Sequence, residues 1–513
     1  MAQDAITVTI NGNAITAPRG TLLSGLLAHG HTYQPMPCGG RGTCGKCRVK
    51  VEGSVTPPTR AEMELLGTAD LNAGIRLACM TYATGDCRIT AFQGDISQIC
   101  TQTRLPDGSS GLEDTLAVPI FKKYGVAIDI GTTTIAACLY DREWCMLAAK
   151  GMPNPQAAWG ADVISRMEKA LDGQANALSQ QASGCLNELI TSLSSLGSIN
   201  TQEIDALVIT GNTVMLHLLT ETDVTPLTYA PFAAKRLFGE WITAADVQLH
   251  VLPPRTKVYL MPCISAFTGG DLVASLMACD FCHGDSSKLL ADIGTNGEMA
   301  LWHKEQLLVC STAAGPAFEG VNISMGMVSG MGAIDRVSLC NGRLFPHVIG
   351  DIPAAGICGS GIVDAVACLL DGDTMDETGR LDCDPMPITP TVSLTQADIR
   401  NIQVAKSSIV SGLMTLMHEA AVAAADISSL YIAGGFGHYL DARNAGKIGL
   451  LPSDLVSRVK LLDNAALTGA SMVLLDKSLT TVADKIAKQA RCIDLATNPF
   501  FARVFVEEMG FNT

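Results

Sequence analysis

The sequence is poor in charged and in aromatic side chains. Asp, Glu, Lys and Arg together make up 17% of the 513 residues, and Phe, Trp and Tyr make up 5%. Because the hydrophobic fraction is 48%, this composition argues against long disorder and supplies ample material for buried cores. No apolar run reaches about 18 residues, so no membrane span is expected. The N-terminal stretch MAQDAITVTI lacks the basic region and long apolar core of a signal peptide, so we expect a soluble, cytoplasmic protein.

The chain also has no excess of basic residues. The chain has 35 Lys and Arg against 50 Asp and Glu, a formal net charge of −15. Phosphate backbones and anionic lipid surfaces are bound by clustered basic residues. The composition therefore predicts no nucleic-acid partner and no membrane partner. At roughly 100–200 residues per domain, the length predicts about three folding units.

Cysteine and glycine, by contrast, are plentiful, with 18 and 49 residues. The chain is too long for a small secreted scaffold stapled by disulfides. In a reducing compartment the thiols are available as metal ligands, so we expect some of them to bind metal.

Three of these cysteines share one glycine-rich loop, PCGGRGTCGKC. They are Cys38, Cys44 and Cys47, with the spacing C-x5-C-x2-C, and Cys79 follows in RLACM. Three clustered thiolates and one distant thiolate can enclose a [2Fe–2S] cluster, and glycines let backbone amides approach the sulfurs. Zinc is the alternative, but a structural zinc site usually has a second short Cys pair, and Cys79 stands alone. We therefore predict these four cysteines as ligands of a [2Fe–2S] cluster.

The elements around this loop fit a small ferredoxin. A hairpin is expected at Asn11-Gly12, and a short helix and further strands follow it. The first 95 residues resemble the β-grasp fold of [2Fe–2S] ferredoxins, with a spacing similar to the adrenodoxin type. The expected elements are strands 5–10, 14–17, 47–52 and 86–92 and a helix over 21–29.

Residues 96–123 have the composition of a linker, with PDGSSG at their centre. A tether that lets the first domain move and a static surface connector are both compatible with this composition.

The remainder of the chain contains a repeat. GVAIDIGTTTIAACLY and KLLADIGTNGEMALW align so that Asp129 matches Asp292, 163 residues later. In each copy an apolar strand ends in Asp, a Gly/Thr turn follows, and two more strands are expected. Repeated units of this kind predict two similar halves, residues 124–285 and 286–513.

The two turns have the chemistry of a phosphate site. A tight glycine turn points backbone N–H groups inward, and Thr hydroxyls add further donors. The Asp at the strand end is an acceptor and can hold Mg²⁺ through water. We therefore expect the turns to grip a triphosphate and its metal from two sides. The residues concerned are Gly131, Thr132, Thr133 and Thr134 in the first turn and Gly294, Thr295, Asn296 and Gly297 in the second.

Further glycine-rich elements follow the same plan. LYIAGGFGHYL is a strand that enters a glycine pair, where a flat ligand can approach the backbone closely. The stretch 206–219 is expected to be strand, turn and helix, and its turn can approach the nucleotide. Helices are expected within 356–368 and 399–425; plain core packing is the alternative for the residues of these three segments. The ligand-contacting candidates are Gly211, Asn212, Thr213, Gly434, Gly435, Phe436 and Gly437.

This order of elements resembles the actin/sugar kinase/Hsp70 ATPase superfamily. Together with the ferredoxin-like start, the chain resembles the reductive activators of corrinoid-dependent methyltransferases along its whole length. The resemblance implies an α+β, β-grasp ferredoxin domain followed by an α/β, duplicated, ribonuclease H-like ATPase. The motifs that carry it are PCGGRGTCGKC, AIDIGTTT, NPQAAWGADVISRM, TGNTVMLHLL, ADIGTNGEMAL, TAAGPAFEGVNISMGM, GICGSGIVDA and YIAGGFGHYL.

The resemblance also implies a function. Such activators use ATP to return inactive Co(II) corrinoid to methyl-accepting Co(I). It implies that Asp129 and Asp292 position Mg²⁺ through water, that the two turns hold phosphates, and that residues 434–437 meet adenosine. Glu298, after the second turn, is expected to orient the attacking water. The implied cofactors are a [2Fe–2S] cluster, ATP and Mg²⁺.

The implied partners are a corrinoid protein and an unidentified low-potential electron donor, and a homodimer is left open. Two other functions also remain open. One is an activator of another low-potential enzyme, similar to those of 2-hydroxyacyl-CoA dehydratases, although these hold a [4Fe–4S] cluster between two subunits. The other is a redox-regulated small-molecule kinase. A second metal site at Cys279 and Cys282 is a further alternative.

Overall fold

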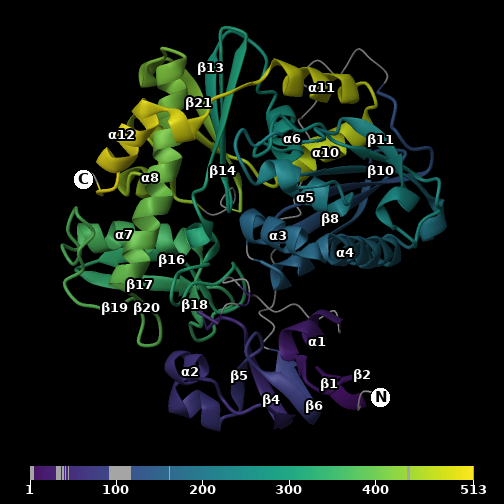
Figure 1. The fold of residues 1–513 in the computed structure, drawn as a ribbon. Coiled ribbons are helices and arrows are strands. Elements are labelled where there is room, and N and C mark those ends of the chain that lie inside the picture. The colour runs from purple at the N-terminus through teal and green to yellow at the C-terminus, as the bar shows by residue number, and fades with distance from the viewer. Residues whose placement is uncertain are drawn as a thin grey trace. The chain divides into compact units, whose positions relative to one another are not determined.

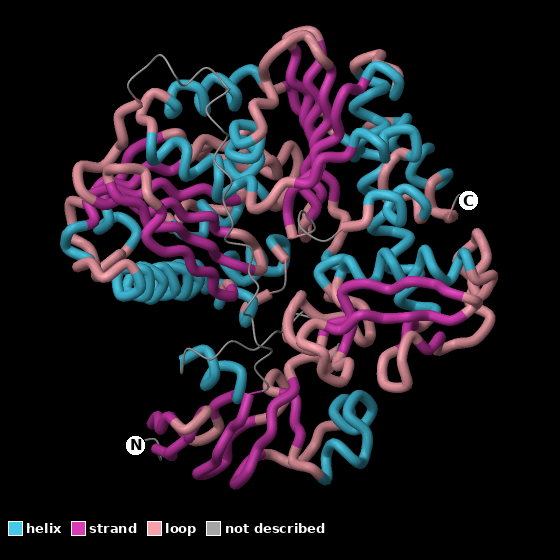
Figure 2. The backbone as a smooth tube through the Cα atoms, turned by 180° about the vertical axis from the view of Figure 1, so that it is seen from behind, coloured by secondary structure: helices cyan, strands magenta, loops and turns pink. Residues whose placement is uncertain are grey.

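The computed structural model describes residues 5–29, 36, 40, 42–43, 45–91, 117–160, 162–435 and 440–511. The chain forms two compact units, and Figures 1 and 2 show their helices and strands. Most of the expected linker 96–123 lies outside the described residues, so its character as a tether stays a prediction. Among the described helices, none is long and apolar enough to cross a membrane. The first unit comprises Met1–Asp95 and Pro153–Cys185, and the second comprises Ile96–Met152 and Leu186–Thr513.

The first unit is built on a small mixed sheet. Its strand order is β2-β1-β6-β4-β5, and β3 pairs with β6. β1 and β6 run parallel, and the other pairs are antiparallel. The expected hairpin at Asn11 and the expected helix are confirmed. The elements are β1 (Ala5–Ile10), β2 (Asn13–Pro18), β3 (Thr21–Leu22), α1 (Leu23–His29), β4 (Arg48–Val55), α2 (Arg60–Asn72), β5 (Ile75–Leu77) and β6 (Tyr82–Ala91).

A second segment of chain belongs to this unit. Residues 153–185 carry η2 (Pro155–Ala158), α3 (Val163–Lys169), the π-helical η3 (Ala170–Gln174) and the start of α4 (Ala175–Leu196). Ala158 packs against the core of the small sheet. The guanidinium of Arg166, which is fully buried, donates to the carbonyl of Gly160 at 2.9 Å. Residues of the motif NPQAAWGADVISRM thus contribute to the packing of this unit, which the sequence alone does not indicate.

The second unit contains two six-stranded sheets with matching strand order. The first has the order β9-β8-β7-β10-β12-β11, in which β7, β10 and β12 are parallel and β8 is antiparallel to β7. The strands are β7 (Tyr124–Ile130), β8 (Thr134–Asp141), β9 (Met146–Pro153), β10 (Ile204–Gly211), β11 (Glu240–Thr243) and β12 (Lys257–Leu260).

The second sheet repeats this arrangement as β15-β14-β13-β21-β22, with β23 added beside β15. β13, β21 and β22 are parallel, and β14 and β15 continue antiparallel. The duplication predicted from the two DIGT sequences is therefore confirmed. The strands are β13 (Ser287–Ile293), β14 (Gly297–His303), β15 (Gln306–Thr312), β21 (Ile427–Gly434), β22 (Val459–Leu461) and β23 (Arg491–Cys492).

Two helices, α6 (Gly270–Ala278) and α10 (Ala465–Leu475), share one hydrophobic core with both sheets. They cross very closely, because a Cβ at Gly469 would lie 2.0 Å from the carbonyl oxygen of Ala274. Only glycine permits this approach. The crossing brings the start of α6 to the ends of β7 and β13, where the candidate site lies.

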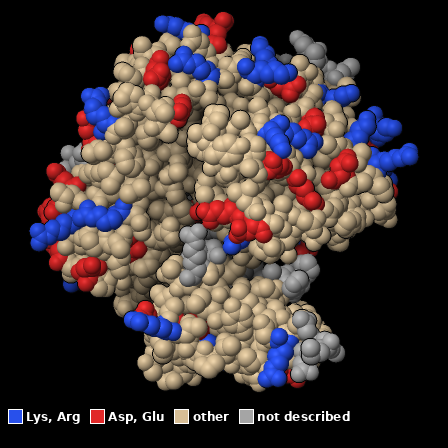
Figure 3. Space-filling model, in the orientation of Figure 1, with Lys and Arg blue, Asp and Glu red and all other residues tan. Residues whose placement is uncertain are grey.

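The long helix α8 (Gln396–Glu419) packs along the second sheet, in a separate core (Figure 1). On the face shown in Figure 3, acidic and basic side chains are interspersed among wide uncharged areas. The other elements are α5 (Thr213–Leu219), β16 (Ala333–Cys340), β17 (Arg343–Val348), β18 (Gly356–Ile357), α7 (Gly359–Asp371), β19 (Met386–Pro387), β20 (Ser393–Leu394), α9 (Ala442–Lys447), α11 (Leu479–Gln489) and α12 (Pro499–Glu507).

Candidate functional site

Two aspartates occupy equivalent places in the two sheets. Asp129 is the penultimate residue of β7, and Asp292 is the penultimate residue of β13. Both strands have a parallel neighbour on one side and an antiparallel neighbour on the other. The repeat in the sequence thus becomes two carboxyl groups at the ends of matching strands. Each is followed by its turn, residues 131–133 or 294–296.

The two turns meet at one carboxylate. The hydroxyl of Thr133 donates to Oε2 of Glu319 at 2.7 Å, and that of Thr295 donates to both carboxylate oxygens at 2.9 and 3.1 Å. A Cβ at Gly294 would lie 3.5 Å from Oε1 of Glu319. Hydroxyl donors from both halves therefore converge on one anionic group, as they would on a phosphate.

Further carboxyl groups line the same place. The backbone N–H of Gly269 donates to Glu298 at 3.2 Å, and Glu298 is also hydrogen-bonded to Asp271 at the start of α6. The hydroxyl of Ser275 lies 3.5 Å from Asp292 Oδ2. Sequence reasoning did not find Asp271. The only signal for it is the Gly-Gly-Asp sequence that opens α6, because its proximity to Asp292 depends on how the helix packs.

Burial, and after it the crowding of carboxyl groups, raises the pKa values of these side chains. Loss of hydration is the largest cause for each, followed for Asp129 and Glu298 by the charges of Asp271 and Asp292. The pKa of Asp292 rises to about 7, first through burial and then through the charge of Asp271. Clustered carboxyls of this kind are a good environment for a divalent cation, which would offset their mutual repulsion. Within the described residues no three His, Cys, Asp or Glu side chains are placed as direct ligands of one ion.

The residues of the β10–α5 turn that were predicted to contact the nucleotide form local hydrogen bonds and close backbone contacts. The side chain of Asn212 caps α5 by accepting from the N–H of Met215 at 3.1 Å, and the hydroxyl of Thr213 donates to the carbonyl of Ser265 at 2.6 Å. A Cβ at Gly211 would lie 2.6 Å from the carbonyl oxygen of Ile130, at the end of β7. The turn therefore lies beside the Asp129 strand, and direct contact with a nucleotide stays a prediction.

The two glycines at the end of β21, Gly434 and Gly435, have different surroundings. Gly434 has φ +86°, and a Cβ there would lie 2.6 Å from Oδ1 of Asp292. At Gly435 an added Cβ would meet no atom within 4 Å among the described residues. Gly434 is thus needed for the close approach of β21 to Asp292, whereas at Gly435 the described residues leave room for a side chain. Phe436 and Gly437 lie outside the described residues.

The cluster loop is described in part, because Cys38 and Cys44 lie outside the described residues. The Sγ atoms of Cys47 and Cys79 are 3.2 Å apart, and both side chains are buried. Gly42 has φ +69°, and a Cβ there would lie 2.6 Å from the sulfur of Met80. Two buried thiols side by side under a glycine loop fit the ligand set of a [2Fe–2S] cluster.

The other Cys pair does not share these features. The thiol pKa values of Cys279 and Cys282 are raised, chiefly by loss of hydration, although both side chains are only partly buried. The thiol of Cys279 lies 3.3 Å from the carbonyl oxygen of Ser275 in its own helix. The described residues supply no group of three ligands around it.

Profiles of three protein families match successive parts of the chain. A 2Fe-2S iron-sulfur cluster binding domain matches residues 8–84, a RACo middle region matches 124–284, and the C-terminal domain of RACo, the ASKHA domain, matches 286–513. Their order along the chain is the order expected from the sequence, a ferredoxin followed by the two halves of an actin-like ATPase.

Individual proteins match over most of the chain. The corrinoid activation enzyme RamQ of Eubacterium limosum is 34% identical over 479 residues, 86% of this chain and 80% of that protein. The [Co(II) methylated amine-specific corrinoid protein] reductase of Methanosarcina barkeri is 26% identical over 429 residues, 76% of this chain and 77% of that protein.

A solved structure, titled reductive activator for corrinoid, iron-sulfur protein, matches with TM-score 0.72 and 27% identity. The match covers 99% of this chain and 98% of that one. The resemblance found in the motifs and the predicted fold class are confirmed. The chain therefore belongs to the family of the corrinoid activation enzymes, with a 2Fe–2S ferredoxin domain followed by the RACo middle region and ASKHA domain.

Proposed function

We propose that this chain is an ATP-dependent reductive activator of a corrinoid protein. It passes one electron from a [2Fe–2S] cluster to the inactive Co(II) corrinoid of a methyltransferase corrinoid protein and restores Co(I). The names of the two relatives, a corrinoid activation enzyme and a corrinoid protein reductase, support this. The observation that carries the ATP-dependent part is the convergence of Thr133 and Thr295 on Glu319.

The second unit would bind and hydrolyse ATP. The turns at 131–134 and 294–297 are suited to the phosphates, and Asp129 and Asp292 to water-bound Mg²⁺. A bound metal ion would offset both the loss of hydration and the repulsion that raise the pKa values of Asp129 and Asp292. No described atom lies within 4 Å of a Cβ at Gly435, which is compatible with adenosine at the end of β21.

Glu298 is our candidate for the group that orients the attacking water. The backbone N–H of Gly269 holds one of its oxygens, and Asp271 shares a hydrogen bond with it. A carboxyl pair that shares one proton can accept a proton from water at one oxygen. Asp271 is therefore added to Glu298 as a candidate for this role.

The first unit would hold the cluster through Cys38, Cys44, Cys47 and Cys79. When bound, the cluster supplies a one-electron carrier. An electron donor of low potential, not yet identified, must reduce it. The glycines of the loop let amide N–H groups approach the sulfurs, and such hydrogen bonds tune the potential of the carrier.

Coupling to ATP has a thermodynamic reason. Each ~60 mV of uphill transfer costs about 1.4 kcal/mol for one electron, so an acceptor well below the donor is reduced only in a coupled process. ATP cannot change the cluster chemistry directly. It can change the affinity of the activator for its partner, which holds the corrinoid in a state that is easier to reduce, and hydrolysis then releases the product.

The test is a visible absorption assay of the cobalt. The reduced chain is mixed with a Co(II) corrinoid protein, Mg-ATP is added, and the band of Co(I) is followed. We expect the band to grow with ATP and to stay small without ATP or in Asp129→Ala. Equal Co(I) formation in all three cases would contradict the coupling. A [4Fe–4S] spectrum would favour a dehydratase-type activator, and a phosphorylated small molecule would favour a kinase.

A further inference from the structure

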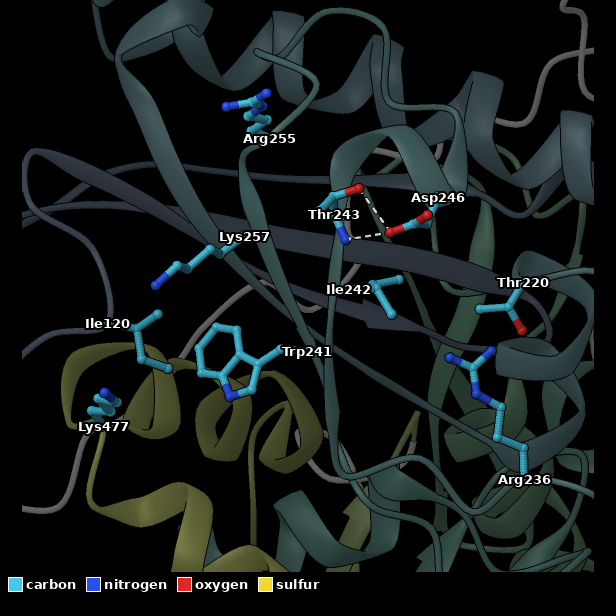
Figure 4. Close-up of a pocket in the computed structure, with 10 residues that line it drawn as sticks. All are labelled: Ile120, Thr220, Arg236, Trp241, Ile242, Thr243, Asp246, Arg255, Lys257 and Lys477. Atoms are coloured by element: carbon cyan, nitrogen blue, oxygen red, sulfur yellow. Dashed lines mark hydrogen bonds between the residues drawn. The ribbon is translucent and has the colours of Figure 1, made fainter.

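A large pocket in the second unit lies away from the carboxyl cluster of the candidate site. It has a volume of about 980 Å³ and opens around β11, the edge strand of the first sheet (Figure 4). Its lining comes from several separate segments of the chain. The lining residues are Ile120, Thr220, Arg236, Trp241, Ile242, Thr243, Asp246, Arg255, Lys257 and Lys477.

The pocket is basic, although the chain as a whole is acidic with a net charge of −15. Four of its ten lining residues are Arg or Lys, and only one is acidic. The acidic one, Asp246, is occupied as a cap, because it accepts from the N–H and hydroxyl of Thr243 at 2.7 Å. Arg236 is paired with Glu240 at 2.6 Å. The remaining cations are therefore the ones open to a ligand.

These cations are Arg255, Lys257 and Lys477. Among the described residues no carboxylate forms an ion pair with any of these three side chains. They enter from two directions, Arg255 and Lys257 from β12 and the loop before it, and Lys477 from the residues after α10. Figure 4 shows the three side chains apart from one another along one side of the view, instead of meeting at one point. Spread cations suit several carboxylates along a segment better than one compact phosphate.

The pocket also offers an aromatic anchor. Trp241 in β11 remains 41% exposed, and its ring lies 5.0 Å from that of Tyr259 on the neighbouring strand. One side of the indole is thus supported and the other is accessible. The chain leading to β11 exposes Tyr229, Phe232 and Leu237 as well. Exposed Trp and Tyr together with Arg are the composition of protein–protein hot spots.

β11 itself is an edge strand of only four residues. An edge strand presents unpaired backbone groups, to which a segment of another protein can add. An open pocket along such an edge, with spread cations and a fixed indole, therefore favours an extended acidic segment over a small anion.

We propose that the pocket around β11 is the docking surface for an acidic segment of the corrinoid protein. The identity of this partner rests on the proposed function; its chemistry rests on the pocket alone. Carboxylates of the partner would pair with Arg255, Lys257 and Lys477, and an apolar side chain would pack on Trp241. Such rim charges chiefly raise the association rate, whereas the aromatic contact slows dissociation.

Binding is measured directly, so that the result does not depend on electron transfer. The full chain with its cluster is titrated onto the immobilised Co(II) corrinoid protein of the reduction assay, with Mg-ATP present. For Arg255→Glu/Lys257→Glu we expect an at least tenfold higher Kd, mostly through slower association, and a weaker dependence on salt. The Trp241→Ala variant should dissociate from the corrinoid protein several-fold faster than the wild type. Arg142→Glu/Lys304→Glu, the same charge change at two exposed turns, should bind within about twofold of the wild type.

The variants must keep their ATPase rate without corrinoid protein, and their thermal transition must be unchanged. An equal Kd for the pocket variant and the wild type overturns the proposal, as does absence of binding by the wild type. Displacement by inorganic pyrophosphate beyond the effect of matched ionic strength would assign the pocket to a small anion. Loss of a wild-type dimer in the variant would assign it to a second copy. Binding that depends on the pocket without any Co(I) would contradict the proposed function and leave the docking surface intact.

Discussion

The hydroxyl of Thr133 donates a 2.7 Å hydrogen bond to the carboxylate of Glu319, which lies 186 residues further along the chain. The same carboxylate accepts from Thr295 in the second half. A negative charge therefore lies where both phosphate-type turns direct their donors. Bound nucleotide phosphates must share this space with Glu319 or displace it.

We therefore expect Glu319→Gln to bind ATP more tightly when Mg²⁺ is absent. The Gln side chain can still accept from both hydroxyls, but the charge that repels phosphate is gone. The gain should be about 1 kcal/mol, roughly fivefold in Kd, measured by calorimetry in EDTA. Glu305→Gln, in the exposed turn after β14, should change nothing. A weaker affinity in Glu319→Gln would show that the carboxylate helps to bind nucleotide even without metal.

A second prediction concerns the stability of the ligand-free protein against pH. The pKa of Asp292 is raised by burial and by Asp271 from 3.8 to about 7. The folded state therefore holds a proton that the unfolded state has lost between about pH 4 and pH 7. Stability should fall as pH rises through this window, by up to about 1.4 kcal/mol per pH unit.

Asp292→Asn removes this titration. In calorimetry of the chain without nucleotide, we expect its transition to lie several degrees above that of the wild type at pH 8 and to coincide with it at pH 4. Mg-ATP should raise the wild-type transition and leave that of the variant unchanged. A variant that is less stable than the wild type at pH 8 would contradict the raised pKa.

A third prediction concerns the cluster ligands. Each of Cys38→Ser, Cys44→Ser, Cys47→Ser and Cys79→Ser should lose the visible bands and the bound iron of a [2Fe–2S] centre. Cys87→Ser is the matched control, because Cys87 is also buried in the same small sheet but lies outside the loop. Iron analysis should give two iron atoms in the wild type and in the control. Retention of the bands in Cys47→Ser or Cys79→Ser would exclude that residue as a ligand.

The fourth prediction concerns a buried ion pair beside Cys79. Burial alone would raise the pKa of Glu62, but hydrogen bonds from Arg76, Thr59, the N–H of Leu77 and Thr81 lower it from 4.5 to about 2. This carboxylate ties α2 to the strand end and turn that carry Cys79. Its stabilisation is fully present above about pH 4.5 and is lost as pH falls towards 2.

Glu62→Gln leaves the guanidinium of Arg76 buried without its partner, which should cost about 3–5 kcal/mol. We expect this variant to lose the cluster at a much lower urea concentration than the wild type does. The loss is measured by the visible absorbance of the cluster. Glu64→Gln, which removes the exposed pair with Arg60, should shift the midpoint little. Equal midpoints for both variants would mean that the buried pair does not hold the cluster turn.

The sequence predicted what depends on local pattern. The alternating strands and Asn11-Gly12 are sufficient for the first hairpin, and the two DIGT copies are sufficient for the matching sheets. In each case the residues of one pattern are neighbours in the chain, as Asn11 and Gly12 are, or the residues within each DIGT copy. The fold class and the family followed from such motifs in order.

Contacts between distant segments could not be predicted in this way. Asp271 joins the site because Gly469 lets α10 and α6 cross closely. No motif or spacing in the sequence predicts that these two helices cross. The hydrogen bonds of Glu319 join it to Thr133 and Thr295, which lie 186 and 24 residues away in the chain. Asn212 is predicted from the sequence as a ligand contact; the cap that its side chain provides for α5 is a second role that the sequence analysis did not include. Residues 153–185 belong with the first unit through packing alone.

The glycine pair after β21 gives the last prediction, because it separates steric need from ligand contact. Gly434→Ala would place a methyl group 2.5 Å from the carbonyl oxygen of Ile293 in a strained backbone with φ +86°, so we expect a lower thermal transition and lost ATP binding together. Gly435→Ala meets no described atom within 4 Å and should leave the transition unchanged. If adenosine lies against this residue, Gly435→Ala should nevertheless raise the Kd for ATP about tenfold, while inorganic triphosphate, which has no base, should bind as it does to the wild type. Unchanged ATP affinity in Gly435→Ala would remove the adenosine from this part of β21.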